Sequence, residues 1–68
     1  MVKTKTQERV KLGDNRELRI IRLDNGYQDL IRLDTHLRDG TAYSGVVFPA
    51  AALKTVIAAL AKVDARGD

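Results

Sequence analysis

The sequence contains no cysteine, no tryptophan, one proline and one histidine among its 68 residues. Without cysteine the chain cannot form disulfides or thiolate zinc sites, and a single histidine, His36, makes a structural metal site unexpected. The core of so small a domain rarely supplies more than about 3–5 kcal/mol, so disulfides, a metal or oligomerisation usually supplement it. The composition therefore leaves oligomerisation as the expected support.

The sequence also lacks the motifs of common enzyme classes. It has no cysteine nucleophile, no Gly-x-Ser-x-Gly motif and no glycine-rich phosphate loop. His36 lies between Asp34 and Arg38 in a predicted strand, where a lone imidazole without a nucleophile is typical of a surface residue. We therefore expect no catalytic residues, no cofactor, no metal and no small-molecule substrate.

Long apolar segments are absent as well. No apolar run at the N-terminus resembles a signal peptide, and no segment approaches the roughly 20 apolar residues of a membrane span. We expect an intracellular protein, in the cytoplasm or in the nucleoid or nucleus, that has no membrane partner.

The net charge of +3 is distributed unevenly along the chain. Residues 1–22 carry seven cations and three acids, whereas residues 23–68 carry five cations and six acids. A positive N-terminal third favours a polyanionic partner, although the solvated surface of a strand would give the same pattern.

The stretch 48–63 predicts the helix around which the domain is arranged. Pro49 suits the first position of a helix, where its missing N–H would have no partner in any case. Apolar residues then recur with helical spacing: Leu53, Val56, Ile57, Leu60 and Val63. The opposite side carries alanines, one threonine and only two lysines, so the helix is apolar almost all round.

A helix of this kind is expected to be buried on both sides. One side would cover the protein's own sheet, and the other would meet a second copy of the chain. The alternative is a plain alanine-rich helix with one solvated side. The predicted homodimer interface comprises Leu53, Val56, Ile57 and Leu60.

Four strands are predicted before this helix, at residues 7–12, 16–23, 28–38 and 41–48. Because the connections are short, consecutive strands should be neighbours. The expected fold is therefore α+β: a four-stranded antiparallel β-meander followed by one C-terminal α-helix. Residues 1–6 would form a flexible basic arm, residues 7–63 a single domain, and residues 64–68 a polar tail.

The Asn25-Gly26 pair predicts a two-residue type I′ turn between the second and third strands. One face of the resulting hairpin would carry the apolar residues that the helix covers, with Arg22 and Asp29 paired at its rim. The members of this apolar set are Leu18, Ile20, Ile31, Leu33 and Leu37.

On the outer face, the same register places Arg19 directly opposite Arg32. Two opposed arginines are mildly destabilising by themselves. Either Glu17 and Asp34, which lie diagonally, neutralise them, or the two guanidinium groups hold phosphates. Cations beside apolar side chains also form a platform for unpaired bases, and the predicted apolar neighbours are Ile21, Leu23 and Leu30.

With this order of elements and a cationic outer face, the chain resembles the single-stranded-DNA-binding domain of the transcriptional coactivator family positive cofactor four. The segments that carry the resemblance are 16–26 (RELRIIRLDNG), 30–35 (LIRLDT) and 44–49 (SGVVFP) with the following helix, and it covers roughly residues 9–63. It implies a homodimer joined through its helices, with curved sheets that grip single-stranded or melted DNA through basic and aromatic residues. Arg19, Arg22 and Arg32 stand at or near such basic positions.

The chain departs from the family pattern at its aromatic positions. Around the second turn there is no ring at Asp24 or Asn25, and Tyr27 is the nearest. Leu37 stands where the family has an aromatic residue at the end of the third strand, and Phe48 replaces the asparagine before the helix proline.

The leading hypothesis is a homodimeric, non-enzymatic protein that binds single-stranded DNA or RNA, with DNA favoured, in transcription or other DNA transactions. Its predicted nucleic-acid-binding residues are Arg9, Lys11, Arg19, Arg22, Arg32, Tyr27 and Tyr43. One alternative is a protein-interaction module that docks a partner on Ile21, Leu23 and Leu30. Another is recognition of duplex DNA by the sheet.

Overall fold

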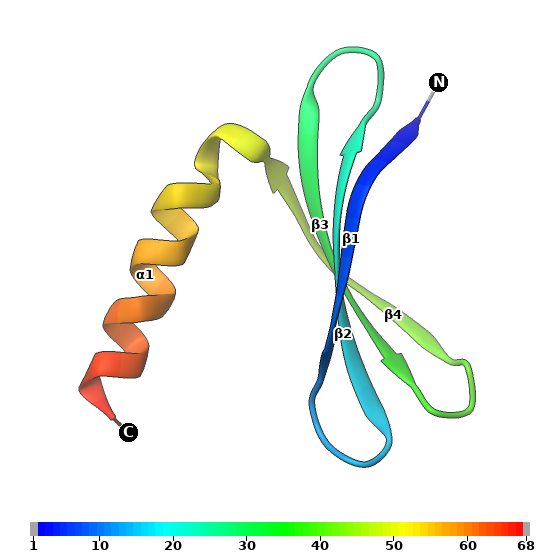
Figure 1. Cartoon of the computed structure of the whole chain (residues 1–68), viewed down its shortest axis with the longest axis vertical. Helices are drawn as coiled ribbons and strands as arrows, with labels where there is room; N and C mark the ends of the chain where they lie inside the picture. The colour runs from blue at the N-terminus through cyan, green and yellow to red at the C-terminus, as the bar shows by residue number, and fades with distance from the viewer. Residues whose placement is uncertain (1, 68) are drawn as a thin grey trace.

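The computed structural model describes residues 2–67. The strands β1 (Lys3–Lys11), β2 (Arg16–Asp24), β3 (Asp29–Leu37) and β4 (Ala42–Pro49) are followed by a 3-10 turn, η1 (Ala50–Ala52), and the helix α1 (Leu53–Arg66). The strands form one antiparallel sheet in the order β1-β2-β3-β4 (Figure 1). The predicted α+β meander with one C-terminal helix is confirmed.

Both ends of the fold extend further than the sequence pattern predicts. β1 begins at Lys3, so residues 3–6, expected as a loose arm, belong to the strand. Its pairing with β2 continues past a bulge between Thr4 and Thr6 to the pair Lys3 and Asp24. At the other end, α1 continues to Arg66 and stops at Gly67, whose φ of 68° is the left-handed value that favours glycine. Part of the predicted polar tail is therefore helical.

The loop between β2 and β3 has four residues instead of the expected two. Asn25 Oδ1 accepts hydrogen bonds from the backbone N–H groups of Tyr27 (2.9 Å) and Gln28 (3.0 Å), and Asp24 Oδ1 accepts one from Gly26 (2.8 Å). These side-chain acceptors stabilise a wider loop, as aspartate and asparagine commonly do in turns. The predicted register is therefore wrong by two residues.

A shift of two residues leaves every side chain on its predicted face, because sides alternate with a period of two along a strand. Ile20 now pairs with Leu33, and Leu18 with Thr35, on one face. We call this the helix-side face. Leu53, the first residue of α1, lines a cavity of about 230 Å³ together with Ile20 and other residues of this face.

A bulge at Gly45 interrupts the pairing of β3 with β4. Leu33 pairs with Val46, while the next residue of β3, Asp34, pairs with Ser44, so Gly45 is the extra residue. A Cβ atom at Gly45 would overlap the carbonyl oxygen of Leu33. Only glycine fits this close approach of the two backbones.

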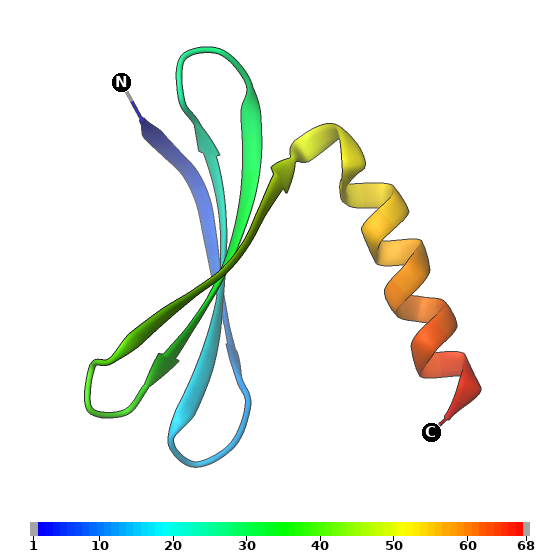
Figure 2. The same ribbon diagram turned by 180° about the vertical axis from the view of Figure 1, so that it is seen from behind.

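The helix α1 stands away from the sheet instead of covering it (Figures 1 and 2). Pro49 lies before the first helical turn with an extended ψ of 139°, so it ends β4 rather than opening the helix as predicted. The expectation that one side of the helix covers the chain's own sheet is wrong. Within residues 2–67, Ile31 is the one apolar residue that is buried, at 2% exposed, and Leu60 on α1 remains 63% exposed.

Candidate nucleic-acid interface

The outer face of the sheet, opposite the helix-side face, carries a cluster of charged side chains in two rows. In one row Arg9 of β1 pairs with Arg19 of β2, which pairs with Asp34 of β3. In the next row Lys11 pairs with Glu17, and Glu17 with His36. Arg32 lies on the same face, two residues before Asp34 in β3. The outer-face charge cluster is Arg9, Lys11, Glu17, Arg19, Arg32, Asp34 and His36.

The two arginines that the sequence placed opposite each other are not opposed. Arg19 faces Asp34, and Arg32 faces Ile21, because the wider loop shifts β3 by two residues. The like-charge pair of this face is instead Arg9 with Arg19, across β1 and β2. The prediction that Arg19 lies opposite Arg32 is therefore wrong, because the observed register separates them.

Two of the cations are held by carboxylates of their own strands. Arg19 Nε lies 2.8 Å from Glu17 Oε2, and Arg32 Nε lies 2.8 Å from Asp34 Oδ2. Asp34 is only 5% exposed, which makes the second pair the more enclosed one. Glu17 and Asp34 therefore each engage one of these arginines, as the neutralised-cluster alternative expected.

The hydrogen bond from Arg19 lowers the pKa of Glu17 from its ordinary value of 4.5. Desolvation opposes this effect, and the charges of Arg19 and then Arg9 act in the same direction as the hydrogen bond. The carboxylate is therefore ionised at neutral pH and offsets part of the positive charge of the cluster.

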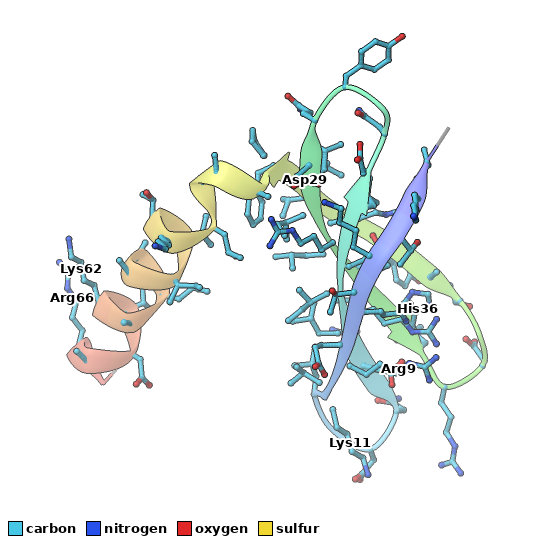
Figure 3. All side chains as sticks on the ribbon, turned by 45° about the horizontal axis from the view of Figure 1, so that its top comes forward. Arg9, Lys11, Asp29, His36, Lys62 and Arg66 are labelled. Atoms are coloured by element: carbon cyan, nitrogen blue, oxygen red, sulfur yellow. The ribbon has the colours of Figure 1, made fainter. Side chains whose placement is uncertain are left out.

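Arg9 and Lys11 are the cations of this face whose charge is least engaged. Both are exposed on β1, an edge strand, and in the described part of the chain neither forms an ion pair. Figure 3 shows both of them toward the same end of the sheet as His36. They are consequently available to a mobile anion without first breaking an internal ion pair.

The other end of the outer face is apolar. Leu23 pairs with Leu30, and Leu30 also pairs with Pro49. Ile21 lies beside Arg32 between this apolar end and the charge cluster. The side chains of Ile21, Leu23 and Leu30 are half-buried, so part of each remains accessible. We call Ile21, Leu23 and Leu30 the outer apolar patch.

Three of the predicted nucleic-acid-binding residues lie outside this face. Arg22 is on the helix-side face, opposite Ile31. Tyr27 is 95% exposed in the loop that connects β2 with β3. Tyr43 pairs with Thr35 on the helix-side face, because the extra residue Gly45 reverses the alternation of β4. The structure thus brings together Arg9, Lys11, Arg19 and Arg32.

Arg22 forms an ion-pair cluster at the rim of the helix-side face. Its Nη2 lies 3.4 Å from Asp29 Oδ2, and Lys5 Nζ lies 2.8 Å from Asp29 Oδ1. Hydrogen bonding and charge from Lys5, followed by those from Arg22, lower the pKa of Asp29 from 3.8. The predicted pairing of Arg22 with Asp29 is confirmed, and it gives Arg22 a structural contact on this face.

Two further cations lie at the charged end of the sheet, although the sequence pattern did not single them out: Arg16 pairs with Leu37 on the helix-side face, and Arg38 follows the end of β3. Arg16 and Arg38 line a cavity of about 360 Å³ together with Lys11 and His36. The backbone N–H of Arg38 donates a hydrogen bond to Asn15 O (2.8 Å), which joins the end of β3 to the loop between β1 and β2. No local pattern signals this contact, because it joins two segments that are far apart in the sequence.

Features of other classes of site are missing from the described residues. Between residues 2 and 67 no three histidine, cysteine, aspartate or glutamate side chains are grouped so that they could hold a metal ion. In the same part of the chain, no helix has the length and hydrophobicity needed to cross a membrane.

Comparison of the chain with models of protein families, with curated proteins and with solved structures gives no match. The resemblance to positive cofactor four therefore stays a prediction from the sequence.

Proposed function

We propose that the protein is a homodimer that binds single-stranded nucleic acid, DNA in the first place, and acts in transcription or other DNA transactions. The observation that carries the proposal is the outer face, where the unengaged cations Arg9 and Lys11 share one surface with the outer apolar patch. Phosphates and unpaired bases require these two kinds of side chain on one surface.

The phosphate contacts are assigned to the charged end of the outer face. Arg9 directly opposite Arg19 costs roughly 0.2–1 kcal/mol in the free protein, as like-charge cross-strand pairs do. A phosphate between the two guanidinium groups converts this repulsion into attraction, and guanidinium binds phosphate with two parallel hydrogen bonds. Arg9 and Lys11 supply the principal contacts, and Arg19 and Arg32 supply weaker ones because carboxylates already hold them.

The base contacts are assigned to the other end. The outer apolar patch offers an accessible apolar surface for unpaired bases, and Tyr27 in the loop between β2 and β3 has a freely accessible ring. Stacking of a base on an aromatic ring contributes about 1–3 kcal/mol. Tyr43 lies on the helix-side face and is not part of this proposed contact surface.

The homodimer accounts for the apolar surfaces that the single chain leaves open. Ile57, Leu60 and Val63 are each more than half exposed on α1, and the helix-side face has an open cavity beside Leu53. Figure 3 shows Lys62 and Arg66 on the side of α1 that faces away from the sheet, and helical spacing separates Lys62 from the apolar stripe of Ile57, Leu60 and Val63. A second copy that packs against this stripe would bury it and leave both lysine and arginine in solvent.

Fluorescence anisotropy with a labelled oligonucleotide, single-stranded and as a duplex, tests the proposal. We expect tighter binding of the single strand and a steep loss of affinity between about 50 and 200 mM salt, because phosphate contacts release counterions. The variant Arg9→Ala/Lys11→Ala should weaken binding and reduce the slope of log affinity against log salt by about 1.4, or about 0.7 for each phosphate contact.

Lys62→Ala/Arg66→Ala is the matched control, since it removes the same charge from the far side of α1. It should leave affinity and salt slope almost unchanged. Equal effects of the two double variants, or an affinity that salt hardly alters, would contradict the proposal. A preference for the duplex would instead favour duplex recognition by the sheet.

The outer apolar patch also supports a second candidate, a protein-interaction module. That function predicts binding to a protein partner that tolerates salt and is lost in Leu30→Ser, with no affinity for nucleic acid. The oligonucleotide titration distinguishes it from the first candidate.

A further inference from the structure

The cavity of about 360 Å³ lies where the charged end of the outer face meets the loop between β1 and β2. Its walls come from Lys11 of β1, the start of β2 at Arg16, and the segment from His36 to Arg38 at the end of β3. Backbone hydrogen bonds fix these walls, from Leu12 N–H to Arg16 O (2.9 Å) and from Arg38 N–H to Asn15 O (2.8 Å).

The cations around the cavity are largely unengaged. In the part of the chain that the structure describes, Lys11, Arg16 and Arg38 form no ion pair, and all three are exposed. Of the acids in the lining, Glu17 is already bonded to Arg19, which leaves Asp14 as the remaining one. The cavity therefore combines a fixed backbone with an excess of available positive charge.

A phosphate group suits this lining better than other anions of similar size. Guanidinium and ammonium groups donate hydrogen bonds without accepting any, and a phosphate offers several acceptor oxygens. A terminal phosphate monoester has a second pKa of about 6, so near neutral pH it carries nearly two negative charges, whereas an internal diester carries one. Three unengaged cations around one cavity favour the more highly charged group.

The position of the cavity also favours the end of a nucleic-acid strand as its ligand. It closes the outer face at the end away from Leu23 and Leu30, where the loop between β1 and β2 bounds the sheet. If the bases of a nucleic-acid strand lie on the outer apolar patch and its phosphates follow Arg9 and Lys11, the end of that strand lies at the cavity.

We propose that this cavity, lined by Lys11, Arg16, His36 and Arg38, binds the terminal phosphate of a nucleic-acid strand. The inference rests on the proposed single-strand binding and adds a preference for phosphorylated ends. One additional negative charge about 4 Å from a cation in a solvated site corresponds to an affinity gain of about five-fold.

Competition between three otherwise identical single strands tests the inference: one with a 5′-phosphate, one with a 3′-phosphate and one with hydroxyl groups at both ends. We expect one phosphorylated strand to bind about five-fold more tightly than the hydroxyl strand. Arg16→Gln/Arg38→Gln should abolish this preference, so that the phosphorylated and hydroxyl strands bind with equal affinity. Lys62→Gln/Arg66→Gln, with the same loss of charge, should retain the preference.

The outcomes separate the inference from the proposed function. Equal affinity for all three strands would overturn the inference and leave single-strand binding intact. Binding of a phosphorylated strand alone, with none of the hydroxyl strand, would support the inference and contradict the proposed function.

A second measurement locates the phosphate independently of oligonucleotide affinity. In a backbone-amide NMR titration with inorganic phosphate, referenced to chloride at equal ionic strength, we expect shifts at residues 13–16 and 38. Shifts elsewhere, or none, would overturn the cavity as the site. Shifts at the cavity without any preference among the oligonucleotides would overturn the assignment to strand ends.

Discussion

Arg9 on β1 lies directly opposite Arg19 on β2, in a row that continues to Asp34 on β3. Glu17 holds Arg19, whereas Arg9 has no ion pair among the residues that the structure describes. The pair therefore introduces a small repulsion into the folded protein.

This arrangement predicts that Arg9→Gln weakens nucleic-acid binding without weakening the fold. Removal of one guanidinium relieves a repulsion of roughly 0.2–1 kcal/mol, so the free energy of unfolding should stay the same or rise by up to that amount. Urea unfolding and oligonucleotide anisotropy on the same samples measure the two effects. A clear loss of stability would show that Arg9 has a structural role instead.

The exposed stripe of α1 predicts that Leu60→Gln disrupts a dimer. On a solvated helix this change would alter stability by no more than about 0.5 kcal/mol, whereas at a packed interface it should cost about 2 kcal/mol or more. Sedimentation should show a shift from dimer to monomer, and the urea midpoint should become lower. Ala58→Gln, on the opposite side of the helix, is the matched control and should change neither; a wild-type monomer at micromolar concentration would refute the interface.

The bulge predicts that Gly45→Ala weakens the pairing of β3 with β4. The new Cβ overlaps the carbonyl oxygen of Leu33, and a steric conflict of this kind costs about 1–3 kcal/mol. Amide hydrogen exchange should accelerate along β3 and β4. Gly40→Ala is the comparison. The φ of Gly40 is 94°, which strains any side chain locally, but a Cβ there would meet no atom within 4 Å, so the effect should remain in the loop before β4. Unchanged exchange in Gly45→Ala would contradict the bulge.

The ion-pair cluster of Asp29 predicts a pH dependence of stability. Lys5 and Arg22 lower the pKa of Asp29 below 3.8, so the folded state binds the proton less readily than the unfolded state. The resulting stabilisation is present above pH 3.8 and is lost as the pH falls through the lowered value. Asp29→Asn should therefore reduce the free energy of unfolding at pH 7 and flatten its decline in acid.

Urea unfolding between neutral and acidic pH measures this difference between Asp29→Asn and the wild type. Some acid dependence should remain in the variant, because Glu17 and Asp39 also have lowered pKa values. Asp14→Asn, in an exposed loop, should behave as the wild type. Parallel curves for Asp29→Asn and the wild type would exclude a contribution of the cluster.

Much of the fold follows from local patterns in the sequence. The apolar and β-branched residues between Leu18 and Leu23 indicate a strand, and the spacing of Val56, Ile57 and Leu60 indicates a helix. These patterns also assign Arg19 and Arg32 to one face correctly, because an error of two residues in the register preserves the faces.

The neighbours across the sheet could not be predicted in the same way. Asn25 accepts hydrogen bonds from Tyr27 and Gln28 and so widens the loop, which separates Arg19 from Arg32. Gly45 inserts one residue into β4 and moves Tyr43 to the helix-side face, where alternation alone would not place it.

The sequence by itself determined the order of the elements, the faces of the central strands and the apolar stripe of the helix, because these depend on contacts and repeats within a few residues. The tertiary structure decided that Arg9 faces Arg19, that Arg16 and Arg38 meet around one cavity, and that α1 leaves the sheet. These features depend on loop hydrogen bonds, a bulge and the backbone direction after Pro49, which join or separate residues far apart in the chain.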